Sequence, residues 1–152
     1  MKFVIQRVSQ ASVTVDNKLV GQIGKGFLVF IGIGQNDTKE TADKMIKKMC
    51  GLRIFSDEND KINLSLSDVN GGLLLISQFT LYADCRKGFR PSFTRAGSPD
   101  IANELYEYIV TKSGEYIHTV EKGVFGAHMN ISLENDGPFT VILETDNEGN
   151  II

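Results

Sequence analysis

The sequence has few of the residues on which side-chain catalysis and metal binding usually depend. It contains two cysteines and two histidines among 152 residues. Cys50 and Cys85 lack a metal-binding or redox spacing, and His118 and His128 have no accompanying carboxylate pattern, so no metal site is expected. The sequence also lacks a Ser-His-Asp set and a phosphate-binding loop. Any chemistry is therefore expected to depend on backbone groups and on the substrate, without a cofactor.

Long apolar segments are missing as well. The longest, residues 27–33, is far too short to span a bilayer. The first seven residues place charge inside an apolar stretch and have no small-residue cleavage site, which is not typical of a signal peptide. Because reduced thiols are the simplest interpretation of the cysteines, we expect a cytoplasmic protein without membrane contact. The net charge of −3 argues against nucleic-acid binding through overall charge but allows a local basic patch.

The residues that are present predict one domain over residues 1–152. Hydrophobic residues make up 41% and charged residues 23% of the chain, close to the averages of soluble globular proteins, and no repeat or linker divides it. The tail at residues 146–152 is expected to fray. Apolar runs and period-two alternation predict strands at residues 3–8, 11–15, 19–23, 26–33, 72–80, 116–122, 127–133 and 138–145.

Two helices are expected between these strands. Asp37 begins a sequence that resembles a capping box, and apolar residues at helical spacing follow it as far as Gly51. Ser98 and Pro99 begin the second helix, which ends at Gly114. Many strands with two principal helices predict an α+β fold with a mainly antiparallel, barrel-like sheet packed on helices.

One segment that could carry chemistry is Ser-Gln-Phe-Thr-Leu at residues 77–81, where a predicted core strand ends. A Ser77 or Thr80 nucleophile would need a base within hydrogen-bond reach, and its neighbours in the sequence supply none. Hydrogen bonds from these hydroxyls to the backbone are the simpler interpretation. A histidine such as His128 could serve as a base, although a surface or packing role is more common. Cys85 lies beside basic residues, a setting in which thiols can be reactive, yet no nucleophile setting surrounds it, and an inert thiol is the simpler interpretation.

A second segment is Asn-Asp-Gly-Pro-Phe-Thr at residues 135–140. It places four turn-forming residues in a row between two predicted strands. Most X–Pro bonds are trans, so an ordinary turn at Gly137-Pro138 is the simpler interpretation. A cis bond there would direct two carbonyls unusually and could serve recognition.

A third feature is a short basic region. Four basic residues alternate with two phenylalanines: Arg86, Lys87, Phe89, Arg90, Phe93 and Arg95. Such a run usually forms a solvated loop. The aromatic residues and the neighbouring Ser-Gln-Phe-Thr segment favour contact with phosphates over a small footprint, such as an RNA end.

Together these residues resemble the D-aminoacyl-tRNA deacylase family of bacteria and eukaryotes. Both polar segments look like signatures of that family, and so do Val-Ile-Gln-Arg-Val at 4–8, Arg-Pro-Ser-Phe at 90–93 and Gly-Val-Phe-Gly-Ala at 123–127. The resemblance covers nearly the whole chain in order. Phe139 stands where the family usually has valine, and His128 occupies a variable position.

The resemblance implies a homodimer with two active sites at the subunit interface. In the family, a cis Gly-Pro bond from one subunit enters the pocket of the other. Gly137 and Pro138 would therefore form a chirality gate that excludes an L side chain and admits a D side chain or glycine. The implied substrates are D-aminoacyl-tRNA and glycyl-tRNA mischarged on tRNA(Ala), bound through the 3′ end.

The resemblance also implies roles at the reaction centre. The backbone N–H groups of Phe79 and Thr80 would donate to the developing oxyanion, while Ser77 and Gln78 shape the pocket. The 2′-hydroxyl of the terminal adenosine would position or activate the attacking water, which accounts for the missing base.

Further residues would bind the RNA. Phe79, Phe125 and Met129 would pack around the adenine, and Arg7 would hold the Gly-Pro segment through its carbonyls. The expected tRNA contacts are Arg86, Lys87 and Arg90.

Three other interpretations remain open. A conventional esterase or amidase would use Ser77 or Thr80 with His118 or His128 as base. A non-catalytic RNA-binding module would share the basic region but need no oxyanion donors. A purely structural dimer is the weakest alternative.

Overall fold

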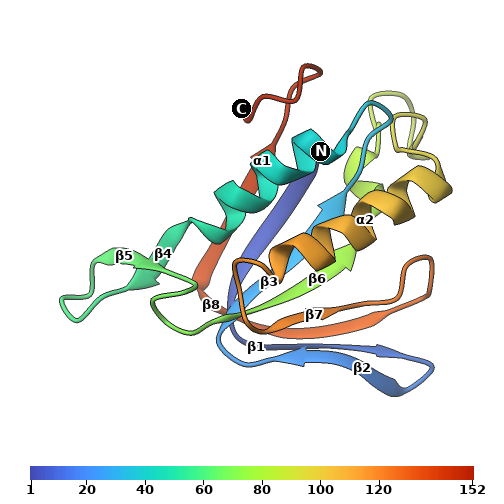
Figure 1. Ribbon diagram of the computed structural model, residues 1–152. Coiled ribbons are helices and arrows are strands. Elements are labelled where there is room, and N and C mark those ends of the chain that lie inside the picture. The colour runs from blue at the N-terminus through green and yellow to red at the C-terminus, as the bar shows by residue number, and fades with distance from the viewer.

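The computed structural model describes residues 1–152 and centres on one long strand. This strand, β1 (Lys2–Val15), buries Phe3, Ile5, Ala11 and Val13 in a period-two pattern. It pairs antiparallel with β3 (Gly26–Gly32) through residues 2–8 and with β2 (Lys18–Ile23) through residues 11–15. The two strands predicted at 3–8 and 11–15 are thus one strand with two successive partners (Figure 1).

The remaining strands complete a mixed sheet. The other edge of β1 pairs antiparallel with β8 (Asn130–Glu144), whereas β3, β6 (Gly72–Ser77) and β7 (Val120–Lys122) are parallel neighbours. A Cβ at Gly21 on β2 would lie 2.8 Å from the carbonyl oxygen of Lys122 on β7. The sheet curls so that β2 and β7 come close together, and the absence of a side chain at Gly21 leaves room for this approach. The predicted α+β fold with a barrel-like sheet is confirmed, with two parallel strand pairs within it.

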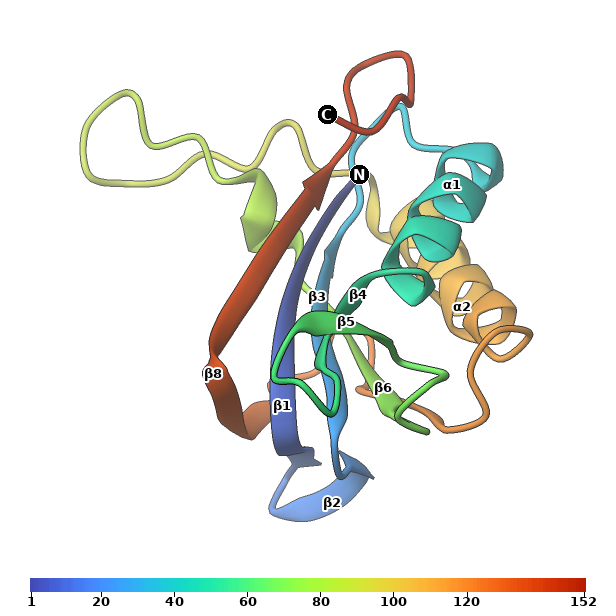
Figure 2. The same ribbon diagram turned by 90° about the vertical axis from the view of Figure 1, so that its left-hand side faces the viewer.

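Two helices, α1 (Lys39–Cys50) and α2 (Pro99–Ser113), cover one face of the sheet (Figure 2). Their apolar stripes join the main core, in which Tyr106 is fully buried and donates its hydroxyl to the carbonyl of Leu75 at 2.8 Å. A smaller core on the opposite face contains Leu28, Leu74 and Ile76. Neither helix has the length and apolar character needed to cross a membrane.

The start of α1 differs from the prediction by one residue. Thr38, and not Asp37, is the N-cap, and its hydroxyl accepts from the Thr41 N–H at 3.2 Å. Asp37 instead accepts from the Gly34 N–H at 2.6 Å and from the amino group of Met1 at 2.7 Å. A local turn and a long-range partner therefore share the side chain that the local pattern assigned to capping.

A hairpin of β4 (Arg53–Ser56) and β5 (Ile62–Ser65) was not predicted. Its turn is stabilised by Asp57, whose carboxylate accepts from the N–H groups of Asn59 and Lys61. Both strands have four residues, too few to show a clear period.

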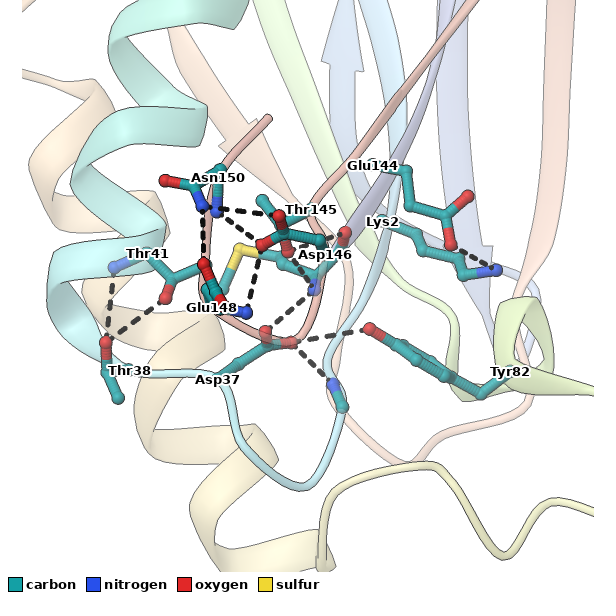
Figure 3. Close-up of polar contacts among 12 residues, drawn as sticks. Lys2, Asp37, Thr38, Thr41, Tyr82, Glu144, Thr145, Asp146, Glu148 and Asn150 are labelled. Atoms are coloured by element: carbon teal, nitrogen blue, oxygen red, sulfur yellow. Dashed lines mark hydrogen bonds and ion pairs between the residues drawn. The ribbon is translucent and has the colours of Figure 1, made fainter. Parts of the chain in front are cut away.

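The C-terminal part of the chain also differs from expectation. The two strands predicted at 127–133 and 138–145 form one strand, β8, with irregular register against residues 6–10 of β1. The tail is folded back and not frayed: Thr145 pairs with Ile151, and Asp146 accepts from the N–H groups of Glu148 and Asn150 (Figure 3). The predicted strand at 116–122 is shortened to Val120–Lys122.

Candidate active site

A cavity of about 630 Å³ opens where β3 and β6 end and α2 begins. Ser77, Gln78 and Phe79 form one side of it, and Phe125 and Met129 lie on the segment that returns from α2 to β8. Most of its lining is apolar, as is usual for sites that bind organic ligands. The fold therefore brings together five of the residues predicted for the reaction centre and the adenine.

The strand predicted at 72–80 ends early, and this creates the polar end of the cavity. β6 stops at Ser77, and Gln78 leaves the strand direction while its N–H donates to the Ile31 carbonyl at 2.7 Å. A 3-10 helix, η1 (Phe79–Tyr82), follows. The N–H groups of a first helical turn have no partner within the helix. Those of Phe79, which lines the cavity, and of its neighbour Thr80 are therefore available as donors.

The Thr80 side chain is not placed as a nucleophile. Its hydroxyl is hydrogen-bonded to the Gln78 amide, and Thr80 does not line the cavity. His128 lines the cavity but His118 does not, and neither histidine is hydrogen-bonded to Ser77 or Thr80. No three His, Cys, Asp or Glu side chains come together as a metal site requires. The cavity thus offers backbone donors and an apolar surface rather than a nucleophile-base pair.

The far end of η1 is anchored by a contact that the sequence did not predict. The Tyr82 hydroxyl donates to the Asp37 carboxylate at 3.5 Å, next to the ion pair of Lys2 and Glu144 (Figure 3). Burial, together with the nearby Asp37 charge, raises the pKa of Tyr82, which keeps the phenol protonated as a donor. Asp37 and Tyr82 are 45 positions apart, and no local pattern could have paired them.

Two glycines on the β3 side allow η1 to pack this closely. A Cβ at Gly32 would lie 3.0 Å from the Leu81 Cβ, and one at Gly34 would lie 2.7 Å from the Tyr82 hydroxyl. A larger residue at either position would require Leu81 or Tyr82 of η1 to shift.

The Gly-Pro segment lies within β8, and its peptide bond is cis. Arg7, which is only 9% exposed, donates its Nε to the Asp136 carbonyl at 2.9 Å and its Nη1 to the Ile54 carbonyl at 2.6 Å. The side-chain oxygen of Asn135 accepts from the Phe139 N–H at 2.7 Å. Gly137 has φ of +141°, a conformation that side chains disfavour. The segment is therefore held firmly while Gly137 and Pro138 stay exposed.

Phe139 contributes to this anchoring. Its ring lies 4.8 Å from the Arg7 guanidinium in a cation–π arrangement. The larger side chain at this position thus packs over the arginine that holds the segment. Neither the Phe139 contact nor the Asn135 hydrogen bond was predicted.

The Gly-Pro segment is far from the cavity in the same chain. Ile131 lines the cavity, whereas Gly137 and Pro138 do not. Gly137 lies six positions after Ile131 along β8, or about 20 Å at the usual rise per residue. One copy of the chain therefore presents the two predicted halves of the site as separate features.

The basic region forms a loop that leaves the body after η1 and returns toward α2 (Figure 2). Phe93, near its end, lines the cavity. Backbone hydrogen bonds of 2.7 and 3.0 Å join Asp84 and Ser92 at its base. Hydrogen bonds from the Arg86 guanidinium hold the pKa of the Asp84 carboxyl well below its usual range. Lys87 and Arg90 are exposed and have no ion-pair partner.

The comparisons with known proteins agree with one another. Residues 4–144 match the family described as D-Tyr-tRNA(Tyr) deacylase. Proteins named D-aminoacyl-tRNA deacylase from Thermosipho africanus and Clostridioides difficile are 54% and 53% identical, each over 95% of this chain and 97% of the relative.

A solved structure described as c-Myc DNA Unwinding Element Binding Protein is 36% identical and superposes with a TM-score of 0.91, over 96% of this chain and 99% of that one. A probable eukaryotic D-amino acid tRNA deacylase shares the fold at 20% identity and a TM-score of 0.80, over 93% of this chain and 97% of its own. The resemblance inferred from the sequence motifs is confirmed: the chain belongs to the D-aminoacyl-tRNA deacylase family.

Proposed function

We propose that this protein is a cytoplasmic homodimer that hydrolyses the ester bond of D-aminoacyl-tRNA, releasing the free amino acid and tRNA. The observation that carries the proposal is the free N–H end of η1 at the edge of a largely apolar cavity. Family membership supports the substrate class.

The N–H groups of Phe79 and Thr80 would stabilise the tetrahedral intermediate. Attack of water on the ester carbonyl places negative charge on its oxygen, and backbone donors already in position lower the energy of that state. The apolar lining excludes bulk water and so strengthens these hydrogen bonds. Ser77 and Gln78 would set the shape of this end of the cavity.

The RNA would supply the group that activates water, which the side chains lack. With the terminal adenine packed against Phe79, Phe125 and Met129, the adjacent 2′-hydroxyl would orient or activate the water. The absence of hydrogen bonds from either histidine to Ser77 or Thr80 supports this division of roles.

The chirality gate would come from the second subunit. Exposed Gly137 and Pro138 would enter the partner's cavity, where their carbonyls face the amino group and the α-carbon of the substrate. The anchoring of Asp136 by Arg7 would keep this wall stiff, so that an L side chain clashes with it. A D side chain would point away and glycine would pass, which adds mischarged glycyl-tRNA to the substrates.

Matched D-, L- and glycyl-tRNA test the proposal directly. We expect catalytic amounts of the purified protein to release amino acid from the D and glycyl substrates and to leave the L substrate intact. Hydrolysis of all three at similar rates would remove the gate. Hydrolysis of none would remove the enzymatic function.

Two changes separate RNA-assisted hydrolysis from a side-chain nucleophile. Thr80→Ala should retain substantial activity, since the hydroxyl faces Gln78 and not the cavity. A substrate whose terminal 2′-hydroxyl is replaced by hydrogen should resist hydrolysis. Loss of more than about a thousandfold in folded Thr80→Ala, the scale of a missing catalytic group, would restore the nucleophile hypothesis.

A non-catalytic nucleic-acid-binding module is the second candidate. The exposed basic loop and the name of the 36% identical solved structure favour it. Tight RNA binding without release of amino acid from any charged tRNA would identify this function.

A further inference from the structure

The tip of the basic loop carries an aromatic side chain that no feature of the fold explains. Phe89 is fully exposed at 107%, more than any other large hydrophobic residue of the chain. It follows Gly88, whose φ of +64° turns the chain at the tip. A phenylalanine in this position buries nothing within the protein, so its apolar surface is available to a partner.

The loop holds this side chain away from the body. Its base is closed by the paired backbones of Asp84 and Ser92 and by the Arg86–Asp84 ion pair, with its shortest contact at 2.5 Å. Figure 2 shows the loop projecting well beyond the sheet and helices. Because the base of the loop is held in place, the exposed Phe89 ring at its tip is positioned to contact a partner outside the cavity.

The charge around the ring favours nucleic acid over protein or lipid. Lys87 and Arg90 flank the Gly88-Phe89 tip, and neither is paired with an acid. Arg86 is neutralised by Asp84 and contributes less. A ring between two free cations matches proteins that bind single strands, in which bases stack on aromatic side chains and phosphates lie along positive charge.

The loop is also close enough to the cavity to contact the same RNA. Phe93 lines the cavity and meets Phe79 edge-to-face with 5.0 Å between ring centroids. Phe93 lies four positions after Phe89, a reach of at most about 14 Å. Stacked nucleotides rise about 3.4 Å each. The tip can therefore meet the nucleotides that directly precede the one in the cavity.

We propose that Phe89 stacks on an unpaired base of the substrate RNA, within about four nucleotides of its terminal adenosine, while Lys87 and Arg90 contact the flanking phosphates. This inference rests on the proposed function, because it places the terminal adenosine in the cavity. Stacking accepts any base, so the contact would hold the 3′ end without selecting among tRNAs.

Binding of labelled RNA tests the contact without relying on catalysis. The probes are an RNA hairpin with a four-nucleotide single-stranded 3′ tail and the same hairpin with a blunt end. Phe89→Ala should weaken binding of the tailed hairpin about fivefold or more, the lower end of base–aromatic stacking, and should leave the blunt hairpin unchanged. Phe89→Trp should restore binding and Phe89→Leu should not. Tyr116→Ala is the matched control. It removes an aromatic ring that is 45% exposed and that lies after the C-terminal end of α2, away from the basic loop.

The outcomes separate this inference from the proposed function. Equal affinity of wild type and Phe89→Ala for the tailed hairpin overturns the stacking inference. So does an equal loss of affinity for the tailed and the blunt hairpin. In deacylation assays, Phe89→Ala should raise KM for D-aminoacyl-tRNA with little change in kcat. The kinetic constants for hydrolysis of D-aminoacyl-adenosine, which lacks the preceding nucleotides, should not change. Failure of the wild-type protein to hydrolyse either substrate would refute the enzymatic function, whereas the hairpin result would still decide the stacking contact.

Discussion

At the scale of single residues, burial decides how the few reactive side chains behave. Cys50 lies in α1 with 6% exposure, and burial raises the pKa of its thiol to about 12. Cys85 is exposed at the base of the basic loop. Because the thiolate is the reactive form, the two thiols should differ sharply in reactivity.

Thiol labelling at pH 8 measures this difference. We expect one equivalent of label on the native protein, at Cys85, and a second only after unfolding, since the Cys50 thiol stays protonated and covered. The Cys85→Ser variant should take up no label while folded. Rapid labelling of two thiols in the native wild type would contradict the burial of Cys50.

Arg7 is the second residue whose surroundings define its role. It is a buried cation whose hydrogen bonds join β4 to the Gly-Pro segment of β8. Arg7→Met keeps most of the side-chain volume but leaves the carbonyls of Ile54 and Asp136 without this donor. We expect the free energy of unfolding to fall by about 2–4 kcal/mol, measured by denaturant titration.

Arg53→Met is the control for this experiment. Arg53 also donates to a backbone carbonyl, that of Asn63, but on the exposed side of the β4–β5 hairpin. Its loss should cost less than about 1 kcal/mol. Similar losses for both variants would show that Arg7 does no more than an exposed arginine.

At the scale of elements, α2 is joined to the strand that leads into the candidate site. The buried Tyr106 hydroxyl and the Gly123 N–H both bond to the Leu75 carbonyl. Leu75 lies two residues before Ser77 on β6, and Gly123 lies two residues before Phe125. One carbonyl thus ties α2 to both walls of the cavity.

Tyr106→Phe tests this connection. The ring remains and one hydrogen bond is lost, so the free energy of unfolding should fall by about 1 kcal/mol. Tyr116→Phe, at an exposed tyrosine, should leave it unchanged. An unaltered stability in Tyr106→Phe would mean that ring packing alone holds α2 in place.

At the scale of the whole molecule, the separation of the cavity from the Gly-Pro segment is the main observation. About 20 Å of β8 lies between them in one chain. If both act on one substrate, a second copy must supply one of them, and a two-fold dimer supplies both sites at once.

Co-expression of two variants tests this arrangement. Ala127→Trp fills the cavity and should abolish hydrolysis. Gly137→Ala places a Cβ 3.0 Å from the Phe139 nitrogen at positive φ and should impair rejection of the L substrate. A heterodimer should regain D-specific hydrolysis, because its open cavity receives an intact Gly-Pro segment from the partner. Continued hydrolysis of the L substrate by purified heterodimers would show that each gate serves its own subunit.

Local patterns in the sequence were enough for much of the fold. Both helices and most strands were identified from three local patterns: period-two alternation, helical spacing of apolar residues, and the Ser98-Pro99 helix start. These patterns reflect interactions between residues close along the chain. The β4–β5 hairpin was missed because its strands are too short to show a period, and the α1 cap was displaced because Asp37 has distant partners.

The sequence by itself determined the family and singled out Ser77–Thr80 and Gly137-Pro138, since both lie in short contiguous motifs. Only the tertiary structure decided that β6 gives way to η1 at Ser77 and that Arg7 binds a carbonyl 129 positions away. It also decided that the cavity and the Gly-Pro segment lie apart. These features depend on packing between distant parts of the chain. The missing Cβ atoms of Gly32 and Gly34 and the buried carbonyl of Ile54 matter there, and no local sequence pattern identifies their partners.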